Sequence, residues 1–325
     1  MTGATVVVDI DGSRDYSEKV SPTVTDADSE NSSFPTKARL SHIRFAAEEE
    51  IPLSAIEGMD DPDTVLGKGA FGEVRKVYWR KTPAAAKVAH PEMPAAQKEL
   101  CLRELELMVR CRHPNVVQFL GFVDEPFVIV LEYMPAGDLR GFLKRRRVPT
   151  GHKVSICLDI LRALSYLHER KPTPIIHRDV KPTNVLMTEM GIAKLTDFGL
   201  SRAYLTSPKP ELVLETEDAP AMESGLSTTV GTQRYMAPEV QSGVYNEKID
   251  IYSAACTFYE IFEPERFNPN DPFAWIATPG KVAAIVKTMG SKNPYDRPAA
   301  LDLVEDFLAT DLARPPTPGG CCAVS

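Results

Sequence analysis

The chain has 325 residues, of which 43% are hydrophobic and 25% are charged, and its formal net charge is −8. This is the composition of an ordinary globular protein, with enough length for one large domain or two smaller ones. The acidic balance and the lack of a basic surface argue against nucleic-acid binding, and no apolar run reaches the ~20 residues that a membrane helix needs.

Residues 1–60 predict an acidic leader, because they carry 12 acidic and 5 basic side chains, whereas the remaining 33 acidic and 32 basic side chains nearly cancel. Residues 1–36 are rich in Ser, Thr, Asp and Glu, and such a segment cannot bury enough apolar surface to offset the entropy of ordering. We therefore expect the leader to be largely disordered. It is either a simple solvated tail or an arm that is phosphorylated or binds a partner.

The start of the chain has too few apolar residues and too many acidic ones for a secretory signal. None of the six cysteines forms a Cys-x-x-Cys pair, which favours a reducing compartment. We therefore expect a cytoplasmic protein.

The first motif has the spacing Gly-x-Gly-x-x-Gly-x-Val and spans Leu66 to Val74. The triplet alone is a weak signal, because dinucleotide-binding folds use a similar one before a helix. Here residues 74–79 alternate in character and contain β-formers, so the glycines join two strands. Glycines in such a hairpin let the backbone approach phosphates without a Cβ clash. The motif predicts contacts with a phosphate-bearing ligand. Its residues are Leu66, Gly67, Lys68, Gly69, Ala70, Phe71, Gly72, Glu73 and Val74.

A strand over Ala84 to Val88 follows and carries Lys87 among apolar neighbours. A buried ammonium group is costly unless it is paired, so Lys87 either reaches solvent along its apolar stem or has an acidic partner. The next segment, from about Pro94 to Arg110, has the apolar spacing of a helix. This helix offers three candidate partners, which are Glu99, Glu104 and Glu106.

Two strands are predicted over Val116 to Gly121 and Phe127 to Leu131, and a helix capped by Asp138 follows. The basic run at residues 144–147 is interpreted as a solvated helix end; the alternative is docking to an acidic partner or a lipid surface. Residues 151–169 predict a long amphipathic helix. Its inward-facing residues are Val154, Leu158, Leu161 and Leu164.

The stretch from Ile175 to Leu186 holds three polar side chains in one short loop between apolar flanks. Phosphoryl transfer needs an acceptor for a hydroxyl proton, a cation near the moving phosphate and an oxygen ligand for Mg²⁺. Asp179, Lys181 and Asn184 match these parts in that order. Asp197 follows a short predicted strand and is placed to chelate the same metal ion.

The segment after Asp197 closes at Met236 to Glu239 and contains an acidic insertion from Ser207 to Glu223. A loop of that length is either functional or disordered. Lys248 to Phe262 predicts a buried helix, and Arg297 lies in a late turn.

Taken in order, these motifs resemble those of eukaryotic protein kinases. The matching elements are the glycine-rich loop, the strand lysine, the loop His177-Arg178-Asp179 with Asn184, Asp197-Phe198-Gly199, Ala237-Pro238-Glu239 and the late Arg297. The resemblance covers about residues 61–310 and implies an α+β, bilobal fold. Residues 61–131 would form an N-lobe of antiparallel sheet and one helix, residues 132–134 a hinge, and residues 135–310 a larger, mostly helical C-lobe.

The resemblance also implies roles for single residues. The catalytic residues would be Asp179, Lys181, Lys87 and Glu104, with Lys87 and Glu104 as an ion pair that orients the phosphates of ATP. Asn184 and Asp197 would hold Mg²⁺. The nucleotide contacts beyond the glycine-rich loop would be Ala85, Lys87, Glu132, Met134 and Leu186, below a Leu131 gatekeeper.

The resemblance further implies a set of structural contacts. Asp250 would anchor the backbone of the catalytic loop, and Arg297 would pair with Glu239. A column of side chains would stand on Asp250 in the active enzyme; its members are Met108, Phe119, His177 and Phe198.

The segment from Arg112 to Val117 and the hinge are most similar to the tyrosine-kinase-like serine/threonine group, and Lys181 favours Ser/Thr targets. The expected function is transfer of the ATP γ-phosphoryl group to protein Ser/Thr hydroxyls in signal transduction. A pseudokinase-like scaffold that binds nucleotide and partners is the alternative. Activating phosphorylation, by an upstream kinase or by the enzyme itself, is expected at Ser227, Thr228 or Thr229.

Residues 311–325 predict a flexible Pro/Gly tail that ends in a candidate prenylation box, Cys322-Ala323-Val324-Ser325. Cys321 could take a second acyl chain, and stable anchoring usually needs two signals. If Cys322 is prenylated, we expect the protein on the cytoplasmic face of a membrane.

Overall fold

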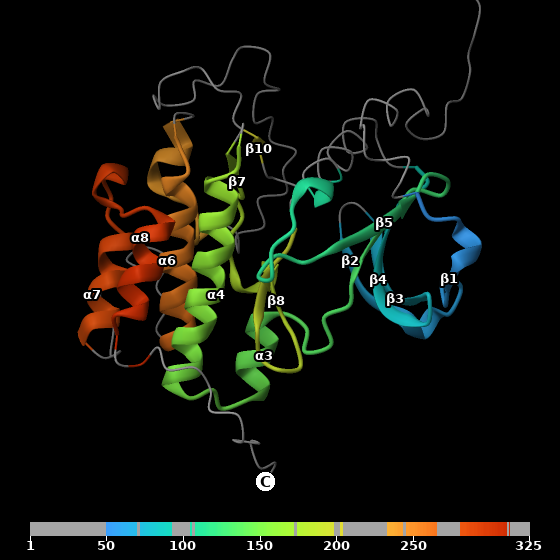
Figure 1. The fold of residues 1–325 in the computed structure, drawn as a ribbon, viewed down its shortest axis with the longest axis horizontal. Helices are drawn as coiled ribbons and strands as arrows, with labels where there is room; N and C mark the ends of the chain where they lie inside the picture. Colours follow the sequence, from blue (N-terminus) through green and yellow to red (C-terminus); the bar gives the residue numbers. More distant parts are fainter. Residues whose placement is uncertain are drawn as a thin grey trace, which may run out of the picture. The chain divides into compact units, whose positions relative to one another are not determined.

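A curled antiparallel sheet forms the first part of the described residues in a computed structural model (Figure 1). The structure describes residues 50–69, 72–92, 105, 108–171, 174–197, 202–203, 233–242, 245–264, 280–310 and 312. The strands of the sheet are β1 (Ile56–Glu57), β2 (Val65–Gly69), β3 (Gly72–Trp79), β4 (Thr82–Ala89), β5 (Phe119–Val123) and β6 (Val128–Glu132). They are hydrogen-bonded in the order β1-β3-β4-β6-β5, and β2 pairs with β3.

One face of this sheet is held by a small apolar cluster. Antiparallel pairing places Val77 of β3 opposite Ala84 of β4, and both are buried. Ile51 and Ile56 pack into the same cluster, and Ile51 N donates to Phe122 O at 2.7 Å. The packed structure therefore extends N-terminal to residue 61, where the sequence analysis placed the start of the domain.

Strand β5 begins at Phe119 rather than at the predicted Val116. Val116 instead forms a bridge with Leu195, and Val117 N donates to Leu195 O at 2.9 Å. The apolar run is continuous, but its first residues pair with a strand almost 80 positions later, so the two halves of the run belong to different ladders.

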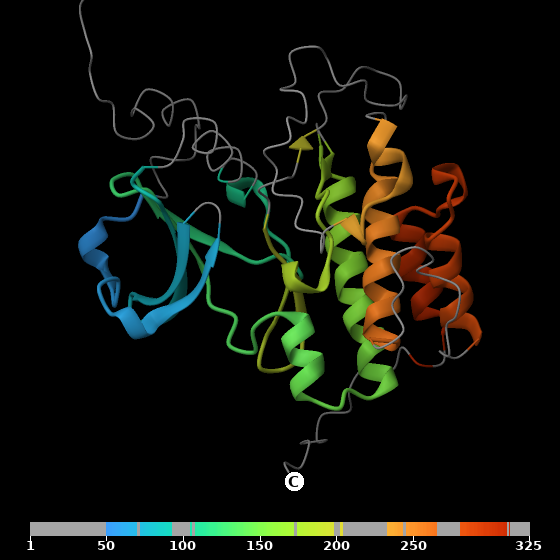
Figure 2. The same cartoon turned by 180° about the vertical axis from the view of Figure 1, so that it is seen from behind.

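The second part of the described chain is mostly helical (Figure 2). Its helices are α3 (Leu139–Arg145), α4 (Thr150–His168), α6 (Lys248–Phe262), α7 (Gly280–Met289) and α8 (Ala300–Leu308). Its short strands are β7 (Ile175–Ile176), β8 (Val185–Met187), β9 (Ala193–Leu195) and β10 (Arg202–Ala203). The 3-10 helices among the described residues are η2 (Leu53–Ala55), η3 (Pro62–Thr64), η4 (Pro182–Asn184), η5 (Pro238–Ser242) and η6 (Pro294–Asp296).

Helix α4 lies against α6 and α8, and its four predicted inward residues are all buried. Helix α6 is buried over most of its length, as its apolar sequence predicts. The rings of Phe258 on α6 and Phe307 on α8 meet edge to face with centroids 5.7 Å apart. None of the helices that the structure describes combines the length and the apolar character required to cross a membrane.

The predicted α+β fold, with a sheet lobe and a helical lobe, is confirmed. The helix predicted from about Pro94 to Arg110 lies largely outside the described residues; Leu105 and Met108 to Arg110 are helical.

Candidate active site

A cleft of about 700 Å³ runs between the sheet and the catalytic loop. Its walls include eight of the predicted nucleotide contacts and both predicted metal ligands. These residues are Leu66, Gly67, Val74, Ala85, Lys87, Glu132, Met134, Leu186, Asn184 and Asp197. The volume suits a small organic ligand, and apolar side chains from both lobes face each other across one end of the cleft.

The glycines of the β2–β3 hairpin have two different surroundings. Gly72 has φ +140°, and a Cβ on it would lie 1.9 Å from Val88 O, so the fold itself demands glycine there. A Cβ on Gly67 or Gly69 would meet no described protein atom within 4 Å. The open space at these two positions fits close approach by a bound ligand.

The catalytic loop brings Asp179, Lys181 and Asn184 together. Lys181 Nζ donates to Asp179 Oδ2 at 2.7 Å, and Asn184 Nδ2 donates to the same oxygen at 2.8 Å. Asn184 Nδ2 also donates to Asp179 O at 2.9 Å. Both side-chain bonds use Oδ2, so the carboxylate is fixed in orientation through one of its two oxygens.

The predicted anchor of this loop is in place. The fully buried carboxylate of Asp250 accepts from His177 N and Arg178 N, each at 2.8 Å, and is 2.9 Å from His168 Nε2. Burial alone would raise the pKa of Asp250, but the His168 contact and the other partners outweigh it and lower that pKa. Arg178 has φ +69°, a left-handed conformation that two bonds to one carboxylate help to hold.

The imidazole of His177 links the loop to the strand that precedes Asp197. Asp179 N donates to His177 Nδ1 at 3.3 Å, so the ring proton belongs on Nε2, which then donates to Thr196 O at 3.0 Å. Thr196 N in turn donates to Asn184 O at 3.0 Å. The residue before Asp197 is therefore tied to the catalytic loop at both of its backbone polar groups.

Lys87 and Asp197 meet across the cleft, with 3.9 Å between Nζ and Oδ1. Asp197 has φ +68°, which turns the chain sharply after β9. Asn184 and Asp197 supply hard oxygen donors of the kind that Mg²⁺ prefers. Among the described residues no three His, Cys, Asp or Glu side chains converge as a metal site, so a metal ion here would take its remaining ligands from phosphates and water, as Mg²⁺ usually does.

A family model described as "Protein kinase domain" matches residues 61–322 of this chain. The chain belongs to the protein kinase family. Three relatives from Arabidopsis thaliana illustrate the match. Serine/threonine-protein kinase 12 is 44% identical over 284 residues, which is 85% of this chain and 58% of the relative. Serine/threonine-protein kinase VIK is 38% identical over 64% of this chain and 47% of its own length.

Serine/threonine-protein kinase CTR1 is 31% identical over 77% of this chain and 32% of its own length. The chain thus spans about a third to three fifths of the length of these relatives. The predicted tyrosine-kinase-like serine/threonine group is confirmed by this similarity.

The side chain of Glu132 makes hydrogen bonds that the sequence did not indicate. Its carboxylate accepts from Lys194 Nζ at 2.7 Å and from Gln118 N at 2.6 Å, so the side chain is directed to β9 rather than to the nucleotide. Only the backbone of Glu132 remains for the predicted hinge contact. In the adjacent hinge residue Tyr133, the centre of the aromatic ring lies 5.0 Å from Lys76 Nζ.

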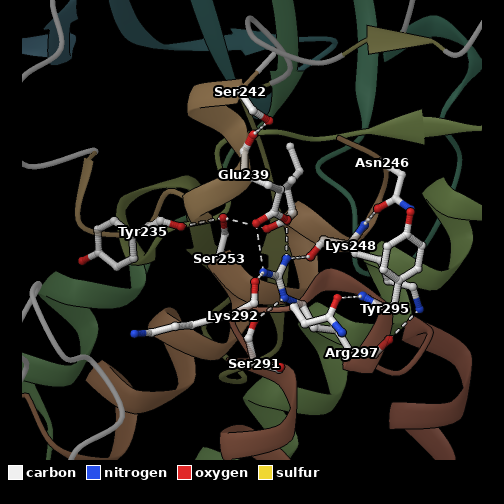
Figure 3. Close-up of polar contacts among 12 residues, drawn as sticks. Tyr235, Glu239, Ser242, Asn246, Lys248, Ser253, Ser291, Lys292, Tyr295 and Arg297 are labelled. Carbon is white, nitrogen blue, oxygen red and sulfur yellow. Dashed lines mark hydrogen bonds and ion pairs between the residues drawn. The ribbon is translucent and has the colours of Figure 1, made fainter. Parts of the chain in front are cut away.

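The lower part of the kinase is held by the predicted pair of Glu239 and Arg297 (Figure 3). Arg297 Nη1 and Nη2 donate to the two carboxylate oxygens of Glu239 at 2.5 and 3.0 Å. The other N–H groups donate to backbone oxygens of Lys248, Ser291 and Lys292. All five guanidinium donors are therefore satisfied inside the protein.

A second cluster of polar side chains, Arg140, Tyr235 and Glu260, joins α3 to α6. Arg140 Nε donates to Glu260 Oε1 at 2.9 Å, and Arg140 Nη2 donates to Tyr235 Oη at 2.6 Å. Tyr235 Oη donates to Glu260 Oε2. Burial and the bond to Glu260 raise the pKa of Tyr235, so the residue that precedes Met236 is held as a neutral phenol.

Several predicted residues do not line the cleft or cannot be placed. Lys68, Gly69, Gly72 and Glu73 lie in β2 and β3 but are not wall residues. Those outside the described residues are Ala70, Phe71, Glu104, Phe198, Ser227, Thr228, Thr229, Cys321 and Cys322. The ion pair of Lys87 with Glu104 and the column of four side chains therefore remain predictions. Met108 and Phe119 do belong to one buried cluster.

Several residues that line the cleft were not predicted from the sequence, and three of them are polar residues of special interest: Thr183, Arg145 and Arg146. Thr183 lies inside the catalytic loop, so its motif could have revealed it. The two arginines belong to the basic run that was interpreted as a solvated helix end. They are exposed as predicted, but they also line the cleft, and Arg145 donates to Ala136 O. Periodicity along the chain cannot indicate such a contact between segments.

Proposed function

We propose that this protein is an ATP-dependent serine/threonine kinase that transfers the γ-phosphoryl group to protein hydroxyls in signal transduction. The observation that carries the proposal is the placement of Asp179. Its Oδ2 is fixed by Lys181 and Asn184, and its loop is anchored on the buried Asp250.

In this proposal, Asp179 Oδ1 accepts the proton of the substrate hydroxyl and aligns the hydroxyl for in-line attack. Lys181 lies beside that carboxylate and stabilises the negative charge that develops on the transferred group. Lys87 orients the phosphates. Asn184 and Asp197 would hold Mg²⁺, which neutralises phosphate charge when bound. The chain itself mainly positions and stabilises, because phosphoryl transfer needs little covalent chemistry from the protein.

Serine and threonine are favoured over tyrosine as targets by Lys181 and by the names of the three relatives, each printed as a serine/threonine-protein kinase. The pseudokinase alternative is not favoured, because Lys87, Asp179, Asn184 and Asp197 are all present and line or adjoin one cleft.

The test is phosphate incorporation from labelled ATP into the protein itself and into a general protein substrate. Wild type should incorporate phosphate on Ser and Thr, whereas Asp179→Asn should lose at least 100-fold in rate and still bind nucleotide. Asp306→Asn, a change of the same chemistry at an exposed position of α8, should behave as wild type. Equal incorporation by wild type and Asp179→Asn would refute the catalytic role of Asp179.

Activation and location are finer parts of the same proposal. A phosphate on Ser227, Thr228 or Thr229 would suit the guanidinium of Arg178, which adjoins the catalytic Asp179. Prenylation of Cys322, with acylation of Cys321, would place the kinase on a cytoplasmic membrane face. The intact mass of the protein from its own cell reports both modifications at once, and an unmodified mass from active cells would contradict them.

A further inference from the structure

Two arginines stand at the exposed edge of the nucleotide cleft. Arg145 is the last residue of α3 and Arg146 is its C-cap, and both side chains line the cleft while remaining exposed to solvent. Neither forms an ion pair with any residue that the structure describes. By contrast, Arg140 on the same helix is neutralised by Glu260.

Both guanidinium groups are held in position. Arg145 Nη2 donates to the backbone oxygen of Ala136 at 2.6 Å, and the guanidinium of Arg146 lies 5.1 Å from the ring centre of Phe142. A carbonyl and an aromatic ring orient the groups without cancelling their charge. The cations are therefore pre-organised, which lowers the entropic cost of binding an anion.

In the proposed function, the nucleotide would not supply an anion at this edge. Its triphosphate would lie near Lys87 and Asp197, and its base against the apolar wall that includes Val74 and Leu186, both of which line the cleft. Among the described residues, three carboxylates line the cleft. Glu132 is paired with Lys194 and Asp197 with Lys87, which leaves Asp138, whose Oδ1 accepts from Gly141 N as the cap of α3. Two cations against one carboxylate leave a positive edge, and Thr183 in the catalytic loop adds no charge.

We propose that Arg145 and Arg146 determine specificity, by selecting protein substrates that carry an anionic side chain near the acceptor Ser or Thr. This inference rests on the proposed kinase function and names the class of substrate. Two exposed ion pairs of this kind correspond to roughly a tenfold preference in kcat/KM. Electrostatic complementarity of this kind mainly selects partners.

The test uses four peptides that share one Ser acceptor and differ only in flanking residues, which are Glu, phosphoserine, Ala or Lys. With the full chain and saturating ATP, kcat/KM should be about tenfold higher for the Glu peptide than for the Lys peptide. The phosphoserine peptide distinguishes a carboxylate preference from a preference for a previously phosphorylated substrate, and either one supports the inference. The double change Arg145→Glu with Arg146→Glu should reverse the order.

The milder pair Arg145→Gln with Arg146→Gln should make the peptides equivalent and guards against a folding defect in the charge reversal. Lys144→Glu is the matched control, because Lys144 is exposed on the same helix and does not line the cleft; it should keep the preference. A wild-type enzyme that phosphorylates all four peptides equally would overturn the specificity and leave the kinase function standing. A rise in the KM for ATP common to all peptides in the double variants would overturn it too, because the arginines would then serve the nucleotide. Absence of transfer to any peptide or to the protein itself would overturn both proposals.

Discussion

The carboxylate of Glu239 and the guanidinium of Arg297 form two parallel hydrogen bonds although 58 positions separate them in the sequence. The Arg297 side chain is fully buried, and its ring neighbour Tyr252 lies 5.0 Å away. The pair joins η5, which follows Met236, to the turn before α8. It therefore ties the end of the activation segment to the helical core.

We expect Arg297→Met to lower the free energy of unfolding by about 3–5 kcal/mol, because it leaves the carboxylate of Glu239 without its buried partner. Glu239→Gln should cost a comparable amount. The double variant should cost clearly less than the sum, because the two residues stabilise each other. Urea unfolding followed by circular dichroism measures all three, and additive losses would contradict a coupled pair.

The anchor at Asp250 predicts an acid-dependent loss of stability. The folded protein lowers the pKa of Asp250, so the ionised carboxylate stabilises the fold above its unfolded pKa of about 4. That contribution is lost as the pH falls through the lower folded value. Asp250→Asn should therefore be strongly destabilised at pH 7, and the difference from wild type should shrink below about pH 4. A difference that stays constant from pH 7 to pH 3 would rule out this origin.

Helix positions and the grouping of Asp179, Lys181 and Asn184 in one loop could be predicted from the sequence because their signals are local. Helix α4 begins and ends within one residue of its prediction, and Asp138 caps α3 as expected. The contacts of Lys194 with Glu132 and of Val116 with Leu195 could not be predicted. These contacts join segments that are far apart in the sequence. Neither the alternation of apolar residues nor a short motif specifies which distant segment a strand will pair with.

Cys111 predicts a loss of stability at alkaline pH. Burial raises the pKa of its thiol to about 11, against the smaller opposing effects of Arg170 and Arg110. The unfolded chain loses this proton near pH 9 and the folded protein near pH 11, so stability should fall as the pH rises across that interval. Cys111→Ala should flatten the fall, even though it creates a small cavity.

The same burial should protect the thiol from alkylation. At pH 9 the native protein should leave Cys111 largely unmodified by iodoacetamide, whereas the protein in guanidinium should react fully, as peptide mass spectrometry would show. Rapid alkylation of Cys111 in the native protein would contradict its burial.

The hairpin glycines offer a matched pair that separates folding from nucleotide binding. Gly72→Ala places a Cβ against Val88 O in a conformation that side chains rarely adopt, and we expect a loss of about 3 kcal/mol or more in the free energy of unfolding. Gly67→Ala meets no described protein atom within 4 Å. It should leave the unfolding transition nearly unchanged and raise the KM for ATP several-fold, because the added methyl group occupies space that the ligand needs. Thermal unfolding and ATP titration of both variants decide the matter: if Gly67→Ala bound ATP as tightly as wild type, the open space above β2 would not be part of the nucleotide site.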